Sequence, residues 1–96
     1  MTAENYIDTH NIYVDKEGKF VSIRVNPRLY RKDIIMRAAD DLLHNEKMKV
    51  DAIVDGDPEK EIIAKFIPRD RTADADELLR IAHRFNSLLI ASSGKG

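Results

Sequence analysis

Apolar and polar residues alternate over several short stretches of the chain, and this pattern predicts β-strands. The clearest stretch is FVSIRVN at residues 20–26, in which Val21, Ile23 and Val25 share one face. A shorter β-prone run, NIYVD at 11–15, precedes it. The intervening KEGK contains a glycine and predicts a hairpin between the two runs. Pro27 then ends the strand, because proline cannot donate a hydrogen bond to a neighbouring strand.

A second hairpin is predicted between residues 48 and 67. MKVDAIV at 48–54 and IIAKFI at 62–67 each alternate, and DGDP at 55–58 has residues that favour a tight reversal. The second run is apolar on both faces at its ends, so we expect it to lie centrally in a sheet. Pro68 ends it.

Two further segments have apolar residues at helical spacing. The stretch RLYRKDIIMRAADDLLHN at 28–45 predicts a helix with a charged outer side. A second helix is predicted to open at Asp74, which together with Glu77 has the spacing of a capping box. The apolar stripes of the two helices are Ile34, Ile35, Ala38, Ala39, Leu42 and Leu43, and then Leu78, Ile81, Ala82, Phe85, Leu88 and Leu89.

The predicted elements therefore follow the order ββα–ββα, which indicates an α+β fold. The simplest arrangement is a four-stranded, mostly antiparallel sheet with two helices packed on one face. We expect a flexible N-terminus at 1–10, a single domain at 11–91 and a disordered tail at 92–96. The other sheet face would lie open, and a second copy of the chain is one candidate to cover it. Its predicted residues are Phe20, Ser22, Arg24, Lys49, Asp51, Ile53, Ile63, Lys65 and Ile67.

Composition limits the classes of protein to which the chain can belong. The 96 residues are 43% hydrophobic and 34% charged, which is typical of one globular domain. Because there is no cysteine, disulfides, thiolate metal sites and cysteine catalysis are excluded. The N-terminal residues lack the pattern of a secretory signal, and no apolar run reaches the roughly 20 residues of a membrane span. We therefore expect a cytoplasmic protein with no membrane association.

No residue constellation predicts catalysis, a metal or a cofactor. His10, His44 and His83 lie far apart and lack metal-ligand spacing. The acidic stretch DAIVDGD at 51–57 lacks the ligand spacing of a calcium loop. The sequence contains neither a glycine-rich phosphate loop nor a nucleophile elbow. We therefore expect a non-enzymatic protein without a cofactor.

Charge is distributed unevenly along the chain. The net charge is −1, but residues 16–37 carry +5 and residues 38–61 carry −5. Such polarity can guide a charged partner, although charges of both signs also simply solvate a protein surface. The best candidates for a partner-binding surface are Arg24, Arg28, Tyr30, Arg31, Lys32 and Arg37. A nucleic-acid-binding domain would be basic overall and carry stacking aromatic residues, so the overall acidity argues against that class.

Four runs within residues 20–90 resemble one small family. These are SIRVNPRLYRKDIIMRAADDLL, MKVDAIVDGD, EIIAKFIPRD and LLRIAHRFNSLLI. The chain is similar there to HxsD, the D protein of the His-Xaa-Ser peptide maturation system. The matching residues are Tyr30, Ile34, Ala38, Ala39, Phe85, Asn86, Leu88 and Leu89.

The resemblance implies a non-catalytic accessory protein. Members of that family resemble helpers encoded beside radical-SAM enzymes, which modify a repeat-bearing peptide and hold the iron–sulfur chemistry themselves. A helper of this kind would bind a peptide or dock an enzyme. An open sheet edge can add a peptide as an extra strand, and the basic start of the first helix can attract an acidic segment. The alternatives are a small nucleic-acid-binding domain and a structural homodimer.

Overall fold

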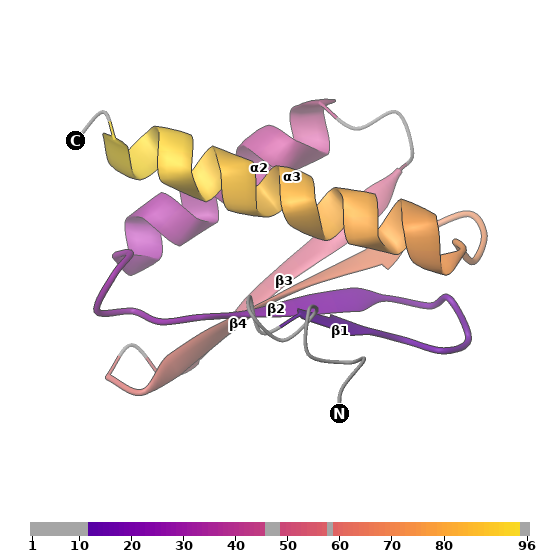
Figure 1. Cartoon of the computed structure of the whole chain (residues 1–96), viewed down its shortest axis with the longest axis horizontal. Helices are drawn as coiled ribbons and strands as arrows, with labels where there is room; N and C mark the ends of the chain where they lie inside the picture. The colour runs from indigo at the N-terminus through magenta and orange to yellow at the C-terminus, as the bar shows by residue number, and fades with distance from the viewer. Residues whose placement is uncertain (1–11, 46–48, 58, 95–96) are drawn as a thin grey trace.

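The computed structural model describes residues 12–45, 49–57 and 59–94, and it confirms the predicted ββα–ββα order (Figure 1). The elements are β1 (Ile12–Val14), β2 (Val21–Val25), α2 (Lys32–Asn45), β3 (Val50–Asp57), β4 (Glu61–Pro68) and α3 (Ala75–Gly94). The predicted flexible N-terminus at 1–10 lies outside the described residues, as does Met48. No helix in the described part of the chain is long and apolar enough to cross a membrane.

The four strands form one antiparallel sheet in the order β1-β2-β4-β3. β4 therefore lies between β2 and β3, as predicted from its apolar ends. The registers place Ile23 opposite both Ile12 and Ala64, and Val54 opposite Ala64 on the other side. β1 and β3 are the two edges of the sheet, and β3 is the longer one.

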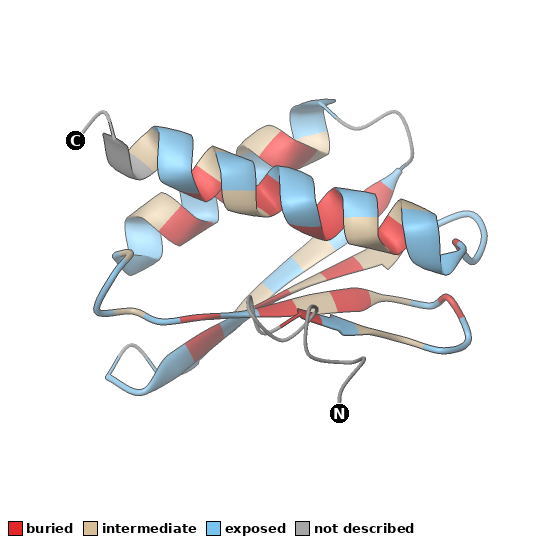
Figure 2. Cartoon of the chain, viewed as in Figure 1, coloured by how far each residue is buried: buried red, intermediate tan, exposed pale blue. Residues whose placement is uncertain are grey.

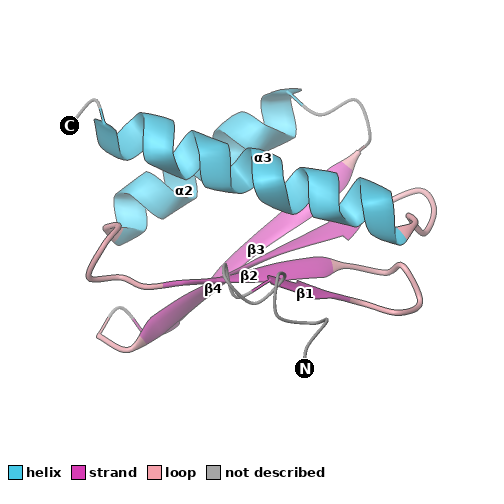
Figure 3. Ribbon diagram, viewed as in Figure 1, coloured by secondary structure: helices cyan, strands magenta, loops and turns pink. Residues whose placement is uncertain are grey.

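Both helices cover the same face of the sheet, which confirms the predicted layering (Figure 3). α2 lies over β3 and β4, while α3 lies over β1 and β2 and also contacts α2. The alternating residues of the strands supply buried side chains to this face, and the inner stripes of the helices complete the core (Figure 2). At its centre, the rings of Phe66 and Phe85 meet edge to face with centroids 5.1 Å apart.

The start of α3 has the predicted capping box. The Glu77 N–H donates to Oδ1 of Asp74 at 2.8 Å, and the Asp74 N–H donates to Oε1 of Glu77 at 3.1 Å. Arg71 also binds the Glu77 carboxylate, with Nη2 2.8 Å from Oε2. These contacts satisfy N–H groups that have no partner within the helix.

The end of α3 differs from the prediction. We expected a disordered tail at 92–96, but the helix continues to Gly94. Each of the two serines, Ser92 and Ser93, costs the helix only about 0.5 kcal/mol relative to alanine. Extending an existing helix adds one hydrogen bond per residue, so α3 continues through them. The final two residues lie outside the described part.

The turn of the second hairpin also lies later than predicted. The segment 55–57 belongs to β3, and the reversal falls between Asp57 and Glu61, where the Lys60 N–H donates to the Asp57 carbonyl at 2.9 Å. Glycine suits this position of β3 because the backbone φ is +127°, which residues with a Cβ rarely adopt. A Cβ there would also lie 2.4 Å from the Glu61 carbonyl oxygen. Local turn preference therefore yields to strand pairing between β3 and β4.

Candidate partner-binding site

A tight turn follows β2 and leads into α2. The Oδ1 atom of Asn26 accepts the Arg28 N–H at 2.9 Å, and the Asn26 carbonyl accepts the N–H groups of Leu29 and Tyr30. This side-chain turn is a role that asparagine commonly takes before proline. It fixes the direction in which the chain leaves the sheet, and it brings the start of α2 to the same end of the molecule as the turn between β3 and β4 (Figure 1).

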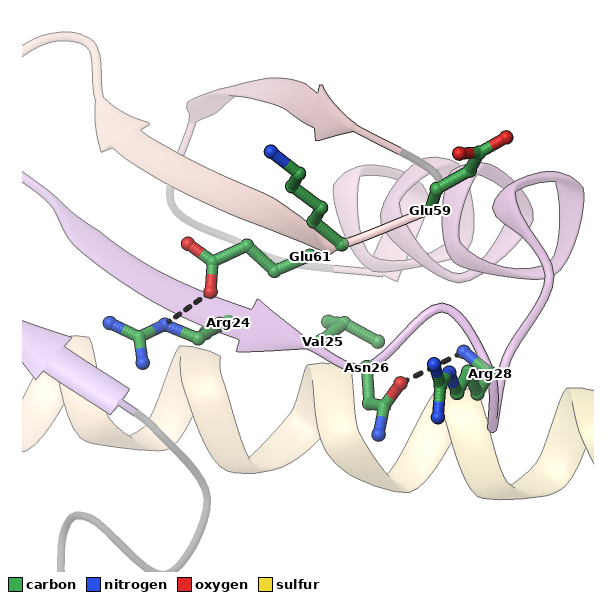
Figure 4. Close-up of a pocket in the computed structure, with 7 residues that line it drawn as sticks. Arg24, Val25, Asn26, Arg28, Glu59 and Glu61 are labelled. Carbon is green, nitrogen blue, oxygen red and sulfur yellow. Dashed lines mark hydrogen bonds and ion pairs between the residues drawn. The ribbon is translucent and has the colours of Figure 1, made fainter.

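A hollow of about 480 Å³ lies between these two connections (Figure 4). It is lined by Arg24, Val25, Asn26, Arg28, Glu59, Lys60 and Glu61. The pairing of Val25 with Ile62 explains why side chains more than thirty positions apart in the sequence share this hollow. We call it the basic hollow, because three cations line it against two carboxylates.

One of these cations is already paired. Nε of Arg24 lies 3.2 Å from Oε1 of Glu61, and Figure 4 shows this contact across the hollow. Both side chains remain about half exposed, so this ion pair contributes little to stability. Neither Arg28 nor Lys60 forms an ion pair with any residue that the structure describes. Their positive charges are therefore available to a carboxylate of a ligand.

The structure separates the six residues predicted to bind a partner. Arg24 and Arg28 line the basic hollow. The other four are Tyr30, Arg31, Lys32 and Arg37, of which Tyr30 is half-buried and packs against the core. Arg31 pairs with Asp33 at 3.1 Å, and its carbonyl accepts the N–H groups of Ile34 and Ile35. Lys32 and Arg37 are exposed on α2.

Sequence reasoning missed Lys60 and Asn26 as residues of this site. Lys60 lines the hollow only because β4 pairs with β2, a strand that does not precede it directly in the chain, and because the reversal falls between Asp57 and Glu61. No pattern within a single strand reveals this partner. The Asn-Pro pair did mark the turn after β2, and Asn26 could have been identified from it.

The open face of the sheet shows the predicted polar and apolar mixture. The side chains of Ile53 and Ile63 are 50% and 37% exposed. They line a shallow depression of about 280 Å³ with Asp55, Gly56 and Lys65. Toward β1, the Tyr13 and Phe20 rings lie 5.7 Å apart, and Nζ of Lys65 lies 4.2 Å from the Phe20 centroid. Ile53 and Ile63 therefore leave apolar surface exposed beside this depression.

The two described histidines, His44 and His83, lie on different helices. The Asp40 carbonyl accepts a hydrogen bond from Nδ1 of His44 at 2.8 Å, and this contact, with the Asp40 charge, raises the pKa of His44. His83 is exposed on α3. Across residues 12–45, 49–57 and 59–94, no three histidine or acidic side chains gather closely enough to hold a metal ion.

In comparisons with known proteins, the chain matches no family model, no curated protein and no solved structure.

Proposed function

We propose that this chain is a small, non-catalytic accessory protein that binds an acidic segment of a protein or peptide at the basic hollow. The observation that supports this most directly is that Arg24, Arg28 and Lys60 all line one concave surface. Arg28 and Lys60 lack ion-pair partners among the described residues. An incoming carboxylate would gain charge-assisted hydrogen bonds to them.

The resemblance to HxsD is consistent with this role. A helper of a radical-SAM enzyme needs to hold a peptide or to dock the enzyme, and neither task requires a reactive group of its own. In this proposal the partner is an acidic segment of the substrate peptide or of the enzyme, and the encounter takes place in the cytoplasm. The exposed Lys32, at the start of α2, adds a positive charge to the helix that follows Arg28 in the chain.

The proposal is tested with a capped, fluorescein-labelled heptapeptide of alternating glutamate and serine. We expect binding to be detected by fluorescence anisotropy and to weaken markedly as the ionic strength rises from about 0.01 M to about 0.15 M, because the Debye length falls from about 30 Å to about 8 Å. The double variant Arg28→Glu/Lys60→Glu should abolish binding.

The matched control is Lys16→Glu, which reverses an exposed charge in the turn between β1 and β2, away from the hollow. It should bind the peptide nearly as well as the unaltered chain. Equal losses in the control and the double variant, or an affinity insensitive to salt, would rule out the hollow as the site.

A specific feature also favours a second candidate function, the binding of single-stranded nucleic acid. The Tyr13 and Phe20 rings lie together on the open face beside the cation of Lys65, and bases stack on such aromatic platforms. However, Lys65 already lies over the Phe20 ring, and residues 38–61, which include all of β3, carry −5. We therefore expect no shift of a labelled oligonucleotide in a native gel at low salt, and a shift that Tyr13→Ala removes would favour nucleic acid instead.

A further inference from the structure

The two edges of the sheet differ in a way that bears on binding. β1 has only three residues, and short edge strands offer little backbone to another chain. β3 has eight residues, and within the described part of the chain nothing pairs with its outer side. A long unpaired strand is a ready template for an additional strand.

The direction of the free backbone groups along β3 follows from one hydrogen bond. The Arg69 N–H donates to the Lys49 carbonyl at 2.9 Å, so Lys49 directs its backbone toward β4. In an antiparallel pair this direction alternates, and Asp51, Ile53 and Asp55 therefore also bond to β4. The backbone groups of Val50, Ala52 and Val54 consequently point outward to the free edge.

The side chains along this edge are incompletely buried on both faces. Ala52 and Val54 lie on the face covered by the helices, but they are only half-buried. On the open face, Ile53 is half exposed beside the depression that it shares with Ile63 and Lys65. A strand added at the edge would bury more of all three β3 side chains.

The charges of β3 indicate which strand would fit. Its open-face acidic residues are Asp51, Asp55 and Asp57, and only Asp51 is paired, with Nε of Arg69 2.9 Å from its Oδ1. Asp55 and Asp57 accept the backbone N–H groups of Gly56 and Glu59 but form no ion pair with a described residue. Like charges opposite one another destabilise strand pairs, and opposite charges stabilise them. A second copy would bring another β3 with its three aspartates, whereas a basic strand would be attracted.

We infer that β3 binds, as an added strand, an extended segment in which basic and small apolar residues alternate. The backbone of the segment pairs with Val50, Ala52 and Val54. Its apolar side chains lie beside Ala52 and Val54 under α2, and its basic side chains lie on the open face near Asp55 and Asp57. This inference rests on the proposed role as a binding protein but uses a surface separate from the basic hollow.

The test uses a capped, labelled heptapeptide of alternating lysine and valine with the full chain. We expect saturable binding, about tenfold weaker in Asp55→Lys and less weakened in Asp55→Asn, which keeps an acceptor for the Gly56 N–H. A matched peptide of alternating glutamate and valine should bind Asp55→Lys more tightly than it binds the unaltered chain. The control is Glu17→Lys, an exposed charge reversal in the turn between β1 and β2.

Amide hydrogen exchange reports the register directly. The lysine-valine peptide should slow exchange at the amides of Ala52 and Val54, which point outward. It should leave Ile53 little changed, because that amide already bonds to β4. Unprotected Ala52 and Val54 amides, or equal affinity in Asp55→Lys, would overturn the inference. So would protection of those amides in the chain alone as its concentration rises, since the occupant would then be a second copy.

The two binding surfaces can fail separately. Arg28→Glu/Lys60→Glu should still bind the lysine-valine peptide, and Asp55→Lys should still bind the glutamate-serine peptide. If the unaltered chain fails to bind only the glutamate-serine peptide, the basic hollow is refuted. If it fails to bind only the lysine-valine peptide, the β3 edge is refuted.

Discussion

Gly18 shows how one residue ties two distant loops together. Its φ is +76°, a conformation that residues with a Cβ rarely adopt. Its N–H donates to the Asp15 carbonyl at 3.1 Å, and its own carbonyl accepts the Ala73 N–H at 2.9 Å. The turn between β1 and β2 is therefore joined to the segment that leads into α3.

Gly18→Ala should destabilise the fold. The new Cβ would lie 2.3 Å from the Ala73 carbonyl oxygen, and the left-handed backbone would be strained as well. We expect the free energy of unfolding, measured by urea denaturation, to fall by about 1–3 kcal/mol. Lys16→Ala, at an exposed position of the same turn, serves as the control. Equal stability of the two variants would contradict this account of Gly18.

Glu77 should make stability depend on acid pH. Its hydrogen bonds from Arg71 and from the Asp74 backbone lower the pKa of Glu77 from 4.5 to about 2. Because the folded state binds this proton less tightly than the unfolded state does, the stabilisation is complete above pH 4.5 and is lost as the pH falls toward about 2. We expect the advantage of the unaltered chain over Glu77→Gln in urea denaturation to shrink from neutral pH to about pH 3. An advantage independent of pH would argue against the Arg71 and Asp74 contacts.

At the scale of elements, the contact between Phe66 and Phe85 holds α3 on the sheet. Both side chains are fully buried, one on β4 and the other on α3. Phe85→Ala would leave a cavity between the two layers and should cost about 3–5 kcal/mol of unfolding free energy. Met36→Ala on α2 removes a half-exposed side chain and should cost far less in the same urea titration. Similar losses would show that α3 does not depend on this contact.

Periodicity predicted most of these elements because each of them buries one face. Alternation located β2 and β4, and the helical stripes located α2 and α3. The prediction failed for the turn of the second hairpin. The Asp-Gly-Asp sequence favours reversal locally, but Gly56 is accommodated within β3. Strand order is not encoded in any one segment, so the meeting of Arg24 and Arg28 with Lys60 could not be predicted.

At the scale of the whole molecule, charge separates into two regions. The basic hollow lies where β2 ends, and the acidic residues of β3 follow the free edge of the sheet. The sequence predicted the two charge blocks but not their positions, because these depend on the order β1-β2-β4-β3. The predicted open face is confirmed as a mixed surface, and its candidate cover, a second copy, stays an alternative.

The acidic edge should keep the isolated chain monomeric. We expect sedimentation equilibrium at neutral pH to give a mass near 11.0 kDa. Replacing two acidic residues, in Asp55→Asn/Asp57→Asn, removes repulsion between copies of β3 and should increase self-association. The control Glu17→Gln removes a charge away from this edge. A dimer of the unaltered chain that is unaffected by the double variant would contradict this role for the edge charges.

The pairing of β2 with β4 has a consequence for how the protein emerges from the ribosome. Val21 of β2 pairs with Phe66 of β4, so the first hairpin and α2 are synthesised well before β4, the strand that pairs with β2. Until β4 is made, one edge of β2 has no paired strand. A nascent chain that pauses before residue 61 would therefore expose the apolar residues of β2 to chaperones. Slowing translation at that point should therefore lower the yield of native protein more than the same delay after β4.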